Sequence, residues 1–206
     1  MKNPLNYQMT DYDCGPTTLF NALTYLFKRE EIPPDVIKYI MLYCLDAYNE
    51  KGEYGKNGTS CMAMMFLSCW LNQFGKVKKF PVQCEYLRGQ DVYIENGSPI
   101  VNGLLQGGVV VVRLRYDVWH YVLFTGVDEH NIYFFDPYYR KQSFRKEGIE
   151  IITDQPQKCN RKVSFDVLNN CGKGMYALGP KDIREAVLIY NRSFPQNTAK
   201  SIEYYI

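Results

Sequence analysis

The chain has 206 residues, of which 46% are hydrophobic and 22% are charged, enough for one large domain with a sizeable core. Its formal net charge of +2 excludes the strongly basic surface expected of a protein that binds nucleic acid or an anionic membrane. No stretch reaches the roughly 18–20 apolar residues of a membrane span, and the first residues lack the apolar core of a secretory signal.

Cysteine and histidine content limits the chemistry further. The seven cysteines are irregularly spaced, and the chain has only two histidines. An odd number of cysteines without a signal favours reduced thiols and a cytoplasmic location over a disulfide framework. No two cysteines have the close spacing of zinc ligands, so the sequence predicts neither a metal nor another cofactor.

A helical period dominates residues 1–75. Residues 14–28 carry apolar side chains at helical spacing, and Asp13 stands where it can cap the open N–H groups of that helix. A second helix follows the sequence IPPDV, and residues 49–60 then form a glycine-rich loop. The third helix, CMAMMFLSCWLNQF, is expected to end at Gly75 and to be buried, because it is apolar nearly all round.

The pattern changes after residue 75. Residues 76–87 predict a strand, and residues 98–108 predict a short helix capped by Ser98. Strand-like runs bounded by turn signals follow: VVVVRLRY, WHYVLFTGV, NIYFFDPYY and KQSFRKEGIEIIT. Near the C-terminus, PKDIREA predicts a helical turn and VLIYNRSF a strand. Helices followed by a mainly antiparallel sheet predict an α+β fold in a single domain over residues 1–206, helical over 1–75 and β-rich over 76–206.

Cys14 stands where the polar run MTDYD meets the first helix. Backbone N–H groups at a helix start point outward, and the helix dipole is positive there, so a thiolate at this place is stabilised and reactive. The other six cysteines lie in apolar patterns, where burial favours the neutral thiol. Cys14 is therefore the candidate nucleophile, provided that a base stands beside it.

Two histidines are available as that base. His130 lies in a hairpin-turn sequence, which indicates a turn residue. His120 lies within a strand, and if this strand pairs with the next so that Gly126 faces His130, then His120 faces Asp136 directly. A carboxylate beside the imidazole would fix its tautomer and stabilise the imidazolium. The pairing of two neighbouring strands thus predicts a His120–Asp136 pair without any long-range folding assumption.

The sequence QMTDYDCGPT, which begins at Gln8, followed by His120 and then by Asp136-Pro137, resembles the papain superfamily of cysteine peptidases. Within it, the pattern is similar to cysteine peptidase family 39, which includes the bacteriocin-leader peptidases that cut after a double glycine. In that family a Gln stands six residues before the Cys, and a His stands about sixteen before an Asp-Pro, as here. NGTS (57–60) also resembles a loop of the stand-alone branch. The likeness covers about residues 5–140, and nothing from about residue 141 onward matches.

The resemblance implies a papain-like fold, a peptide or protein substrate and no cofactor. It implies that Cys14 attacks a carbonyl carbon, and that His120 takes the thiol proton and later protonates the leaving group. Asp136 then orients His120. Gln8 is expected to point its side-chain amide at the developing oxyanion, beside the backbone N–H of Cys14.

Three functions remain open from the sequence. The first is hydrolysis of a peptide or isopeptide bond through a thioester, the second is glutamine deamidation or transglutaminase-like acyl transfer on the same triad, and the third is non-catalytic peptide binding. The family's leader peptidases are fused to a membrane transporter, so the resemblance does not carry over their substrate. The chain's own GGV (107–109) is interpreted as a turn. Specificity is expected to come from loops 49–60, 86–98 and 137–143.

Overall fold

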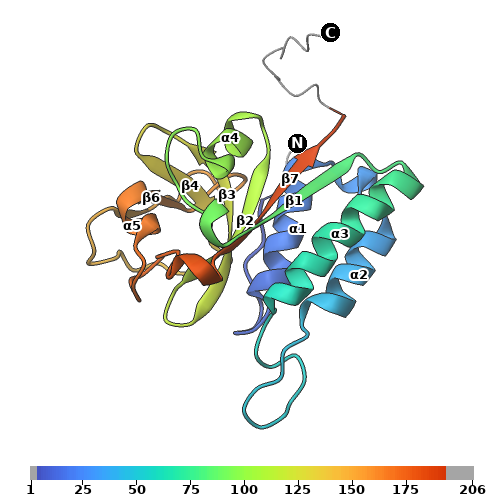
Figure 1. The fold of residues 1–206 in the computed structure, drawn as a ribbon, viewed down its shortest axis with the longest axis horizontal. Coiled ribbons are helices and arrows are strands. Elements are labelled where there is room, and N and C mark those ends of the chain that lie inside the picture. The colour runs from blue at the N-terminus through green and yellow to red at the C-terminus, as the bar shows by residue number, and fades with distance from the viewer. Residues whose placement is uncertain (1–3, 194–206) are drawn as a thin grey trace.

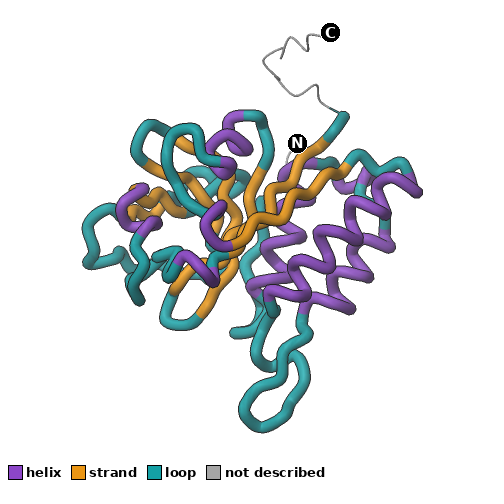
Figure 2. Tube along the Cα trace, in the orientation of Figure 1, coloured by secondary structure: helices purple, strands orange, loops and turns teal. Residues whose placement is uncertain are grey.

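A computed structural model describes residues 4–193 of the chain. In that range the strands form an antiparallel sheet with helices on both faces (Figures 1 and 2). The sheet has seven strands in the order β1-β7-β2-β3-β4-β6-β5, so that β7 lies between β1 and β2. The strands are β1 (Val82–Arg88), β2 (Val109–Arg115), β3 (Trp119–Val127), β4 (Asn131–Phe135), β5 (Ile149–Ile151), β6 (Arg161–Ser164) and β7 (Glu185–Asn191).

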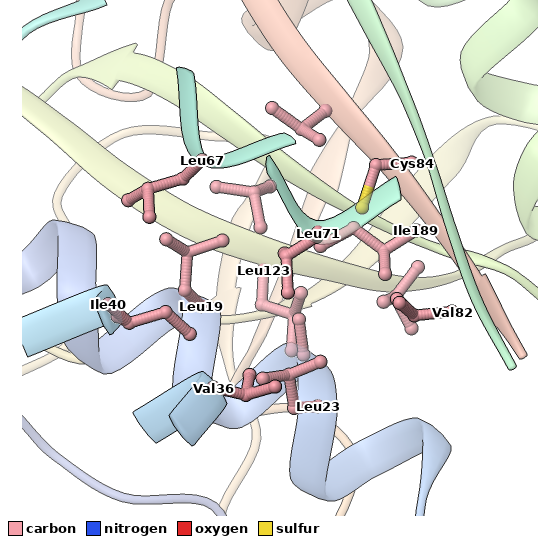
Figure 3. Packing of buried hydrophobic residues seen from close by; sticks show 14 of the residues in the cluster. Leu19, Leu23, Val36, Ile40, Leu67, Leu71, Val82, Cys84, Leu123 and Ile189 are labelled. Atoms are coloured by element: carbon pink, nitrogen blue, oxygen red, sulfur yellow. The ribbon is translucent and has the colours of Figure 1, made fainter. Parts of the chain in front are cut away.

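Three long helices cover one face of the sheet, on the right in Figure 1. They are α1 (Cys14–Leu26), α2 (Pro34–Cys44) and α3 (Cys61–Lys78). Helices α1 and α3 turn apolar stripes toward the strands, where they meet alternate strand side chains. Helix α2 packs its own stripe against α1 and α3, and together these side chains form a first core. Figure 3 shows Leu23 of α1, Leu71 of α3 and Leu123 of β3 among the side chains that fill it.

The opposite face carries the shorter helices α4 (Pro99–Leu105) and α5 (Phe165–Asn169) over a second core. Strand β2 shows how both cores arise, because Val109 and Val111 belong to the first, whereas Val110 and Val112 belong to the second. A strand buried on both faces reads as a continuous apolar run, which accounts for the sequence VVVV. Three 3₁₀ turns complete the described elements: η1 (Arg29–Glu31), η2 (Gly89–Asp91) and η3 (Lys181–Ile183).

The predicted combination of N-terminal helices and an antiparallel sheet is confirmed. The hydroxyl of Ser98 caps α4 as expected, accepting a hydrogen bond from Val101 N at 3.2 Å. Gly107, with φ of 82°, turns the chain from α4 into β2. None of the helices within residues 4–193 is both long and apolar enough to cross a membrane.

The predicted end of the third helix at Gly75 is wrong. Helix α3 continues to Lys78 and ends with Lys79 in the left-handed region at φ of 55°, so the strand predicted over 76–87 begins only at Val82. A Cβ at Gly75 would lie 2.7 Å from the carbonyl oxygen of Phe80. The glycine therefore allows the returning chain to approach the helix, and it does not terminate the helix.

Helix α3 is also not buried all round, contrary to the prediction. The sheet covers one side of it, so Leu67 and Leu71 are buried while Met62 and Phe66 are exposed. The prediction that the six cysteines other than Cys14 all lie in apolar surroundings is also wrong. Cys44, Cys84 and Cys159 are buried, Cys61 is half-buried, and Cys69 and Cys171 are exposed.

The part of the chain after residue 140 departs most from prediction. Only Ile149–Ile151 of the strand predicted over 141–153 pairs in the sheet, and neither β6 nor α5 was expected. The predicted helical turn near residue 181 is the 3₁₀ turn η3, and the predicted strand after it is β7, which begins earlier than expected. The last residue of that prediction, Phe194, lies outside the described residues.

Candidate active site

Cys14 is the first residue of α1 and follows a tight loop. The predicted role of Asp13 as side-chain cap of this helix is wrong, because its carboxylate makes no cap hydrogen bond to it. The carboxylate accepts instead from the backbone N–H groups of Met9 and Thr10, at 3.0 and 2.8 Å. Asp13 thus fixes the loop that leads to Cys14, and no side chain caps the positive end of the helix dipole beside Cys14.

His120 and Asp136 form a buried pair. His120 is the second residue of β3, Asp136 directly follows β4, and His120 Nε2 lies 2.6 Å from Asp136 Oδ1. His120 is 6% exposed and Asp136 is 0% exposed. Because water is excluded from this pair, its electrostatic interaction is stronger than that of a surface pair.

The strand register differs from the predicted one. Phe124 pairs with Phe134 and Leu123 with Phe135, which shifts the pairing by two residues, and a bulge follows between Phe124 and Gly126. His120 and Asp136 are therefore not directly opposed. A shift by two residues keeps every side chain on its face, and diagonal neighbours still lie within reach of long side chains. For that reason His120 and Asp136 are still in contact, although the predicted register was wrong.

The charge state of His120 is set by its neighbours. Burial alone lowers the pKa of the imidazole, but the charge and hydrogen bond of Asp136 outweigh burial, and the Cys14 thiol adds to them. Together they raise the pKa of His120 from its ordinary value near 6.5 to about 10. Since Nε2 is bound to Asp136, Nδ1 is the ring nitrogen left for the thiol. Cys14 and His120 are thus brought together, whereas exposed His130 stays in the β3–β4 turn, where Asp128 binds its N–H.

Asp136 is held by residues that sequence reasoning missed. Its Oδ1 also accepts from Tyr138 N at 2.8 Å, and its Oδ2 accepts from the hydroxyl of Tyr176 at 2.6 Å. The side chain of Asn160 brackets its backbone, with two reciprocal hydrogen bonds of 2.8 Å. Burial opposes ionisation of Asp136, but the charges of His120 and Arg161 and the hydrogen bonds hold its pKa below the ordinary value. No sequence pattern links Asn160, Arg161 or Tyr176 to Asp136, because these three follow it by 24 to 40 positions.

Gln8 lies beside the turn that carries Asp136. Its backbone N–H donates to Pro137 O at 2.9 Å, which attaches the N-terminal loop to the end of β4. Its side-chain Nε2 donates to Thr10 O at 2.8 Å, and its Oε1 is buried without a hydrogen-bond partner in the described part of the chain. The structure therefore gathers all four residues predicted from the sequence, with the Gln8 amide turned toward its own loop.

A cleft of about 740 Å³ opens beside Cys14. One wall comes from the start of α1 and residues 57–60, and the other from the end of β2 and the turn into β3, including Trp119. Of the three loops expected to set specificity, only 49–60 contributes to this cleft. Residues 86–98 lie elsewhere, and their Val92 and Ile94 pack in the second core. Among residues 4–193, no group of three His, Cys, Asp or Glu side chains is placed to hold a metal ion.

Gly15 lets the two segments of the first wall touch. A Cβ at this position would lie 2.7 Å from Thr59 Cβ, too close for any real contact. Gly15→Ala is expected to displace the 57–60 loop and to lower the free energy of unfolding by about 1–3 kcal/mol, the usual cost of overpacking. Urea denaturation would measure it, with Gly172→Ala as control, because a Cβ there would meet only an Asn170 side chain at 3.1 Å. An unchanged midpoint would contradict the packing.

No family model matches the chain, and no curated protein is similar to it. Among solved structures, the chain is similar to the crystal structure of a double glycine motif protease from an AMS/PCAT transporter in complex with the leader peptide. The two chains are 12% identical, the alignment covers 91% of this chain and 89% of that chain, and the TM-score is 0.43. A likeness this distant assigns no activity to the chain.

Proposed function

We propose that the protein is a papain-like cysteine hydrolase that cleaves a peptide or isopeptide bond through a thioester. One observation carries the proposal: a buried His120–Asp136 pair, joined at 2.6 Å, adjoins a cysteine at the start of a helix that opens on a cleft. A nucleophile, a base and a group that orients the base are the arrangement that covalent catalysis requires. A buried charged pair with shifted pKa values that adjoins a thiol beside a cleft favours a catalytic site over a binding scaffold.

The residues divide the reaction between them. The proton of the Cys14 thiol passes first to His120, which holds it as an imidazolium, and the sulfur then attacks the carbonyl carbon. His120 then donates that proton to the leaving amine, the carbon–nitrogen bond breaks, and a thioester remains on Cys14. His120 next takes a proton from water, whose oxygen attacks the thioester, and the thiol is regenerated as the acid leaves. Asp136 keeps the imidazole oriented and stabilises its charged form.

The oxyanion of each tetrahedral intermediate needs donors near Cys14. The backbone N–H of Cys14 at the start of α1 is one, because no side chain caps this helix end. The amide of Gln8 is the second, and its Nε2 carries one N–H besides the one donated to Thr10 O. One such donor stabilises a transition state by roughly 3–4 kcal/mol.

Selective alkylation tests the activated thiol. At pH 6 an ordinary thiol with a pKa of about 8.5 is almost wholly protonated. We expect iodoacetamide to modify Cys14 before any other cysteine at that pH, because the raised pKa of His120 keeps the imidazolium beside Cys14 up to about pH 10. His120→Ala should slow this labelling at least about tenfold. Mass spectrometry of tryptic peptides over time gives the rate at each cysteine.

Two controls make the labelling decisive. Cys69 on α3 is an exposed thiol in the same molecule, so it reports the reactivity of an ordinary accessible cysteine. Gln8→Ala is expected to leave the rate at Cys14 unchanged, because an oxyanion donor acts on the transition state of acyl transfer and not on the resting thiolate. Equal rates at Cys14 and Cys69 would refute the proposed activation.

The bond that is cleaved is identified by its products. A library of peptides with thiol-reactive groups, followed by mass mapping of the adducts, should place the adducts on Cys14 and show which side chains the cleft accepts. Peptides selected in this way are then offered as substrates. Hydrolysis of a peptide bond creates a new amino terminus, deamidation leaves the backbone intact, and acyl transfer consumes an added amine. Products of the last two kinds alone would replace the peptidase proposal by acyl transfer on the same residues.

A further inference from the structure

Tyr176 is a buried tyrosine in a backbone conformation that a bulky side chain rarely adopts. Its φ is 58°, and within residues 4–193 the other non-glycine residue with positive φ is Lys79, which ends α3. Backbone hydrogen bonds hold it there, because its N–H donates to Arg115 O at 2.6 Å and Arg115 N donates to Ala177 O at 2.8 Å. An unfavourable conformation kept in place in this way is a reason to look for a function of the side chain.

The hydroxyl of Tyr176 lies between a carboxylate and a guanidinium. It donates to Asp136 Oδ2 at 2.6 Å and accepts from Arg161 Nε at 3.1 Å. A guanidinium can only donate, so the hydroxyl oxygen of Tyr176 accepts from Arg161 and its proton is directed at Asp136. Arg161 itself is 1% exposed, and its Nη1 donates to the carbonyl of Asn160, the residue that brackets the Asp136 backbone.

Aromatic rings shield these hydrogen bonds from water. The ring of Tyr176 lies 5.0 Å from that of Phe134, 5.5 Å from that of Phe144 and 5.7 Å from that of Tyr116. Burial, followed by the charge of Asp136, raises the pKa of Tyr176 well above its ordinary value. Near neutral pH the Tyr176 hydroxyl is therefore a neutral hydrogen-bond donor.

We propose that Tyr176 is a positioning residue, which fixes the rotation of the Asp136 carboxylate so that Oδ1 stays on His120 Nε2. Each carboxylate oxygen then has its own partners: Oδ1 accepts from His120 and Tyr138 N, and Oδ2 accepts from Tyr176. Without the hydroxyl, Oδ2 has no partner in a site from which water is excluded, and the carboxylate turns to recover one. The consequence for turnover rests on the proposed function, whereas the consequence for His120 does not.

Tyr176→Phe keeps the ring and removes the hydroxyl. The charged and titratable groups that face the pair are Cys14, Arg161, Tyr176 and Tyr116, whose ring lies 5.6 Å from that of His120. Among them Tyr176 binds Asp136 and not His120, so loss of its hydroxyl acts on His120 through Asp136. When the carboxylate turns away, its charge no longer offsets the effect of burial on the imidazole. The pKa of His120 is therefore expected to fall by about one unit. Turnover should fall about 10–100-fold, by analogy with the loss of partners that orient metal-binding histidines.

Imidazole NMR gives the first readout. The chain has two histidines, so two titration curves are expected, and exposed His130 in the β3–β4 turn is an internal reference. Tyr133→Phe is the matched control, because it removes a tyrosine–aspartate hydrogen bond of 3.0 Å on Asp128, in the turn that also carries His130. This control should leave the pKa of His120 unchanged.

A double-mutant comparison gives the second readout. If Tyr176 acts through Asp136, then adding Tyr176→Phe to Asp136→Asn should cost no further turnover, whereas a general loss of stability would add to it. A Tyr176→Phe protein with a lower melting temperature but an unchanged His120 pKa would overturn the proposal. A lowered His120 pKa in a protein whose wild type cleaves no peptide would uphold the positioning role and reject the peptidase.

Discussion

Cys14→Ala is expected to abolish turnover while leaving the fold intact. The change removes the sulfur of the proposed thioester, and loss of the nucleophile in a serine protease costs on the order of 10⁶-fold in turnover. Cys14 lies at the edge of the first core, 7% exposed and open to the cleft, so truncation to alanine leaves space that solvent can reach. Fluorogenic peptides selected by the probe library would measure the rate, and circular dichroism would check the fold.

Other cysteines supply the controls for that experiment. Cys69→Ala should change neither turnover nor stability, because this thiol is exposed on the outer side of α3. Cys84→Ala should lower stability without changing the turnover of the folded protein, because Cys84 fills part of the first core beside Ile189 and Leu71 (Figure 3). Residual turnover in Cys14→Ala close to that of wild type would end the catalytic interpretation.

Asp136→Asn is expected to retain the fold and to lower turnover by about 10²–10⁴-fold, the upper value being that of the same change in a serine triad. Asp136 accepts hydrogen bonds from His120, Tyr138 N and Tyr176, and an amide cannot accept all three with one oxygen. An amide turned the other way donates to His120 Nε2 and holds the imidazole in the wrong tautomer. In either orientation the charge that stabilises the imidazolium is lost.

The pH dependence of this variant has a definite sign. The Asp136 charge is what raises the pKa of His120 against burial, so its removal lowers that pKa and the imidazolium is lost at a lower pH. Labelling of Cys14 should therefore need a more alkaline solution in Asp136→Asn than in wild type. The matched change at the turn, Asp128→Asn, should leave the labelling profile in place. A wild-type profile in Asp136→Asn would contradict the role of the carboxylate.

The parts of the site that could be predicted depend on local geometry. Cys14 follows from the position of a helix start, and His120 with Asp136 follows from two neighbouring strands joined by a short turn. This pair was predicted correctly despite the wrong register, because strand side chains alternate with period two and a shift by two residues keeps them on the same face. The change from a helical to a strand-like period after residue 75 predicted that helices precede the sheet, but the two cores on opposite faces of the sheet were not predicted.

The parts that could not be predicted depend on long-range packing. Nothing near Tyr176 or Arg161 in the sequence indicates that they meet Asp136, and the positive φ of Tyr176 follows from hydrogen bonds to β2, about sixty residues earlier. Gly75 was taken for a helix terminator, although its role is to admit the backbone near Phe80. The cap assigned to Asp13 was wrong because its carboxylate accepts from the backbone N–H groups of Met9 and Thr10 in the preceding loop.

The place of β7 has a consequence for how the protein is made. This strand lies between β1 and β2, and it pairs Asn191 with Val82 across more than half of the chain. A ribosome releases β1 and β2 long before β7, so these two strands must wait with open edges until residues 185–191 emerge. Tyr176 and Arg161 also arrive after Cys14, His120 and Asp136. During synthesis the nascent chain thus carries Cys14 well before the groups that hold Asp136, and on the proposed function activity appears only once residues as late as Tyr176 have been made.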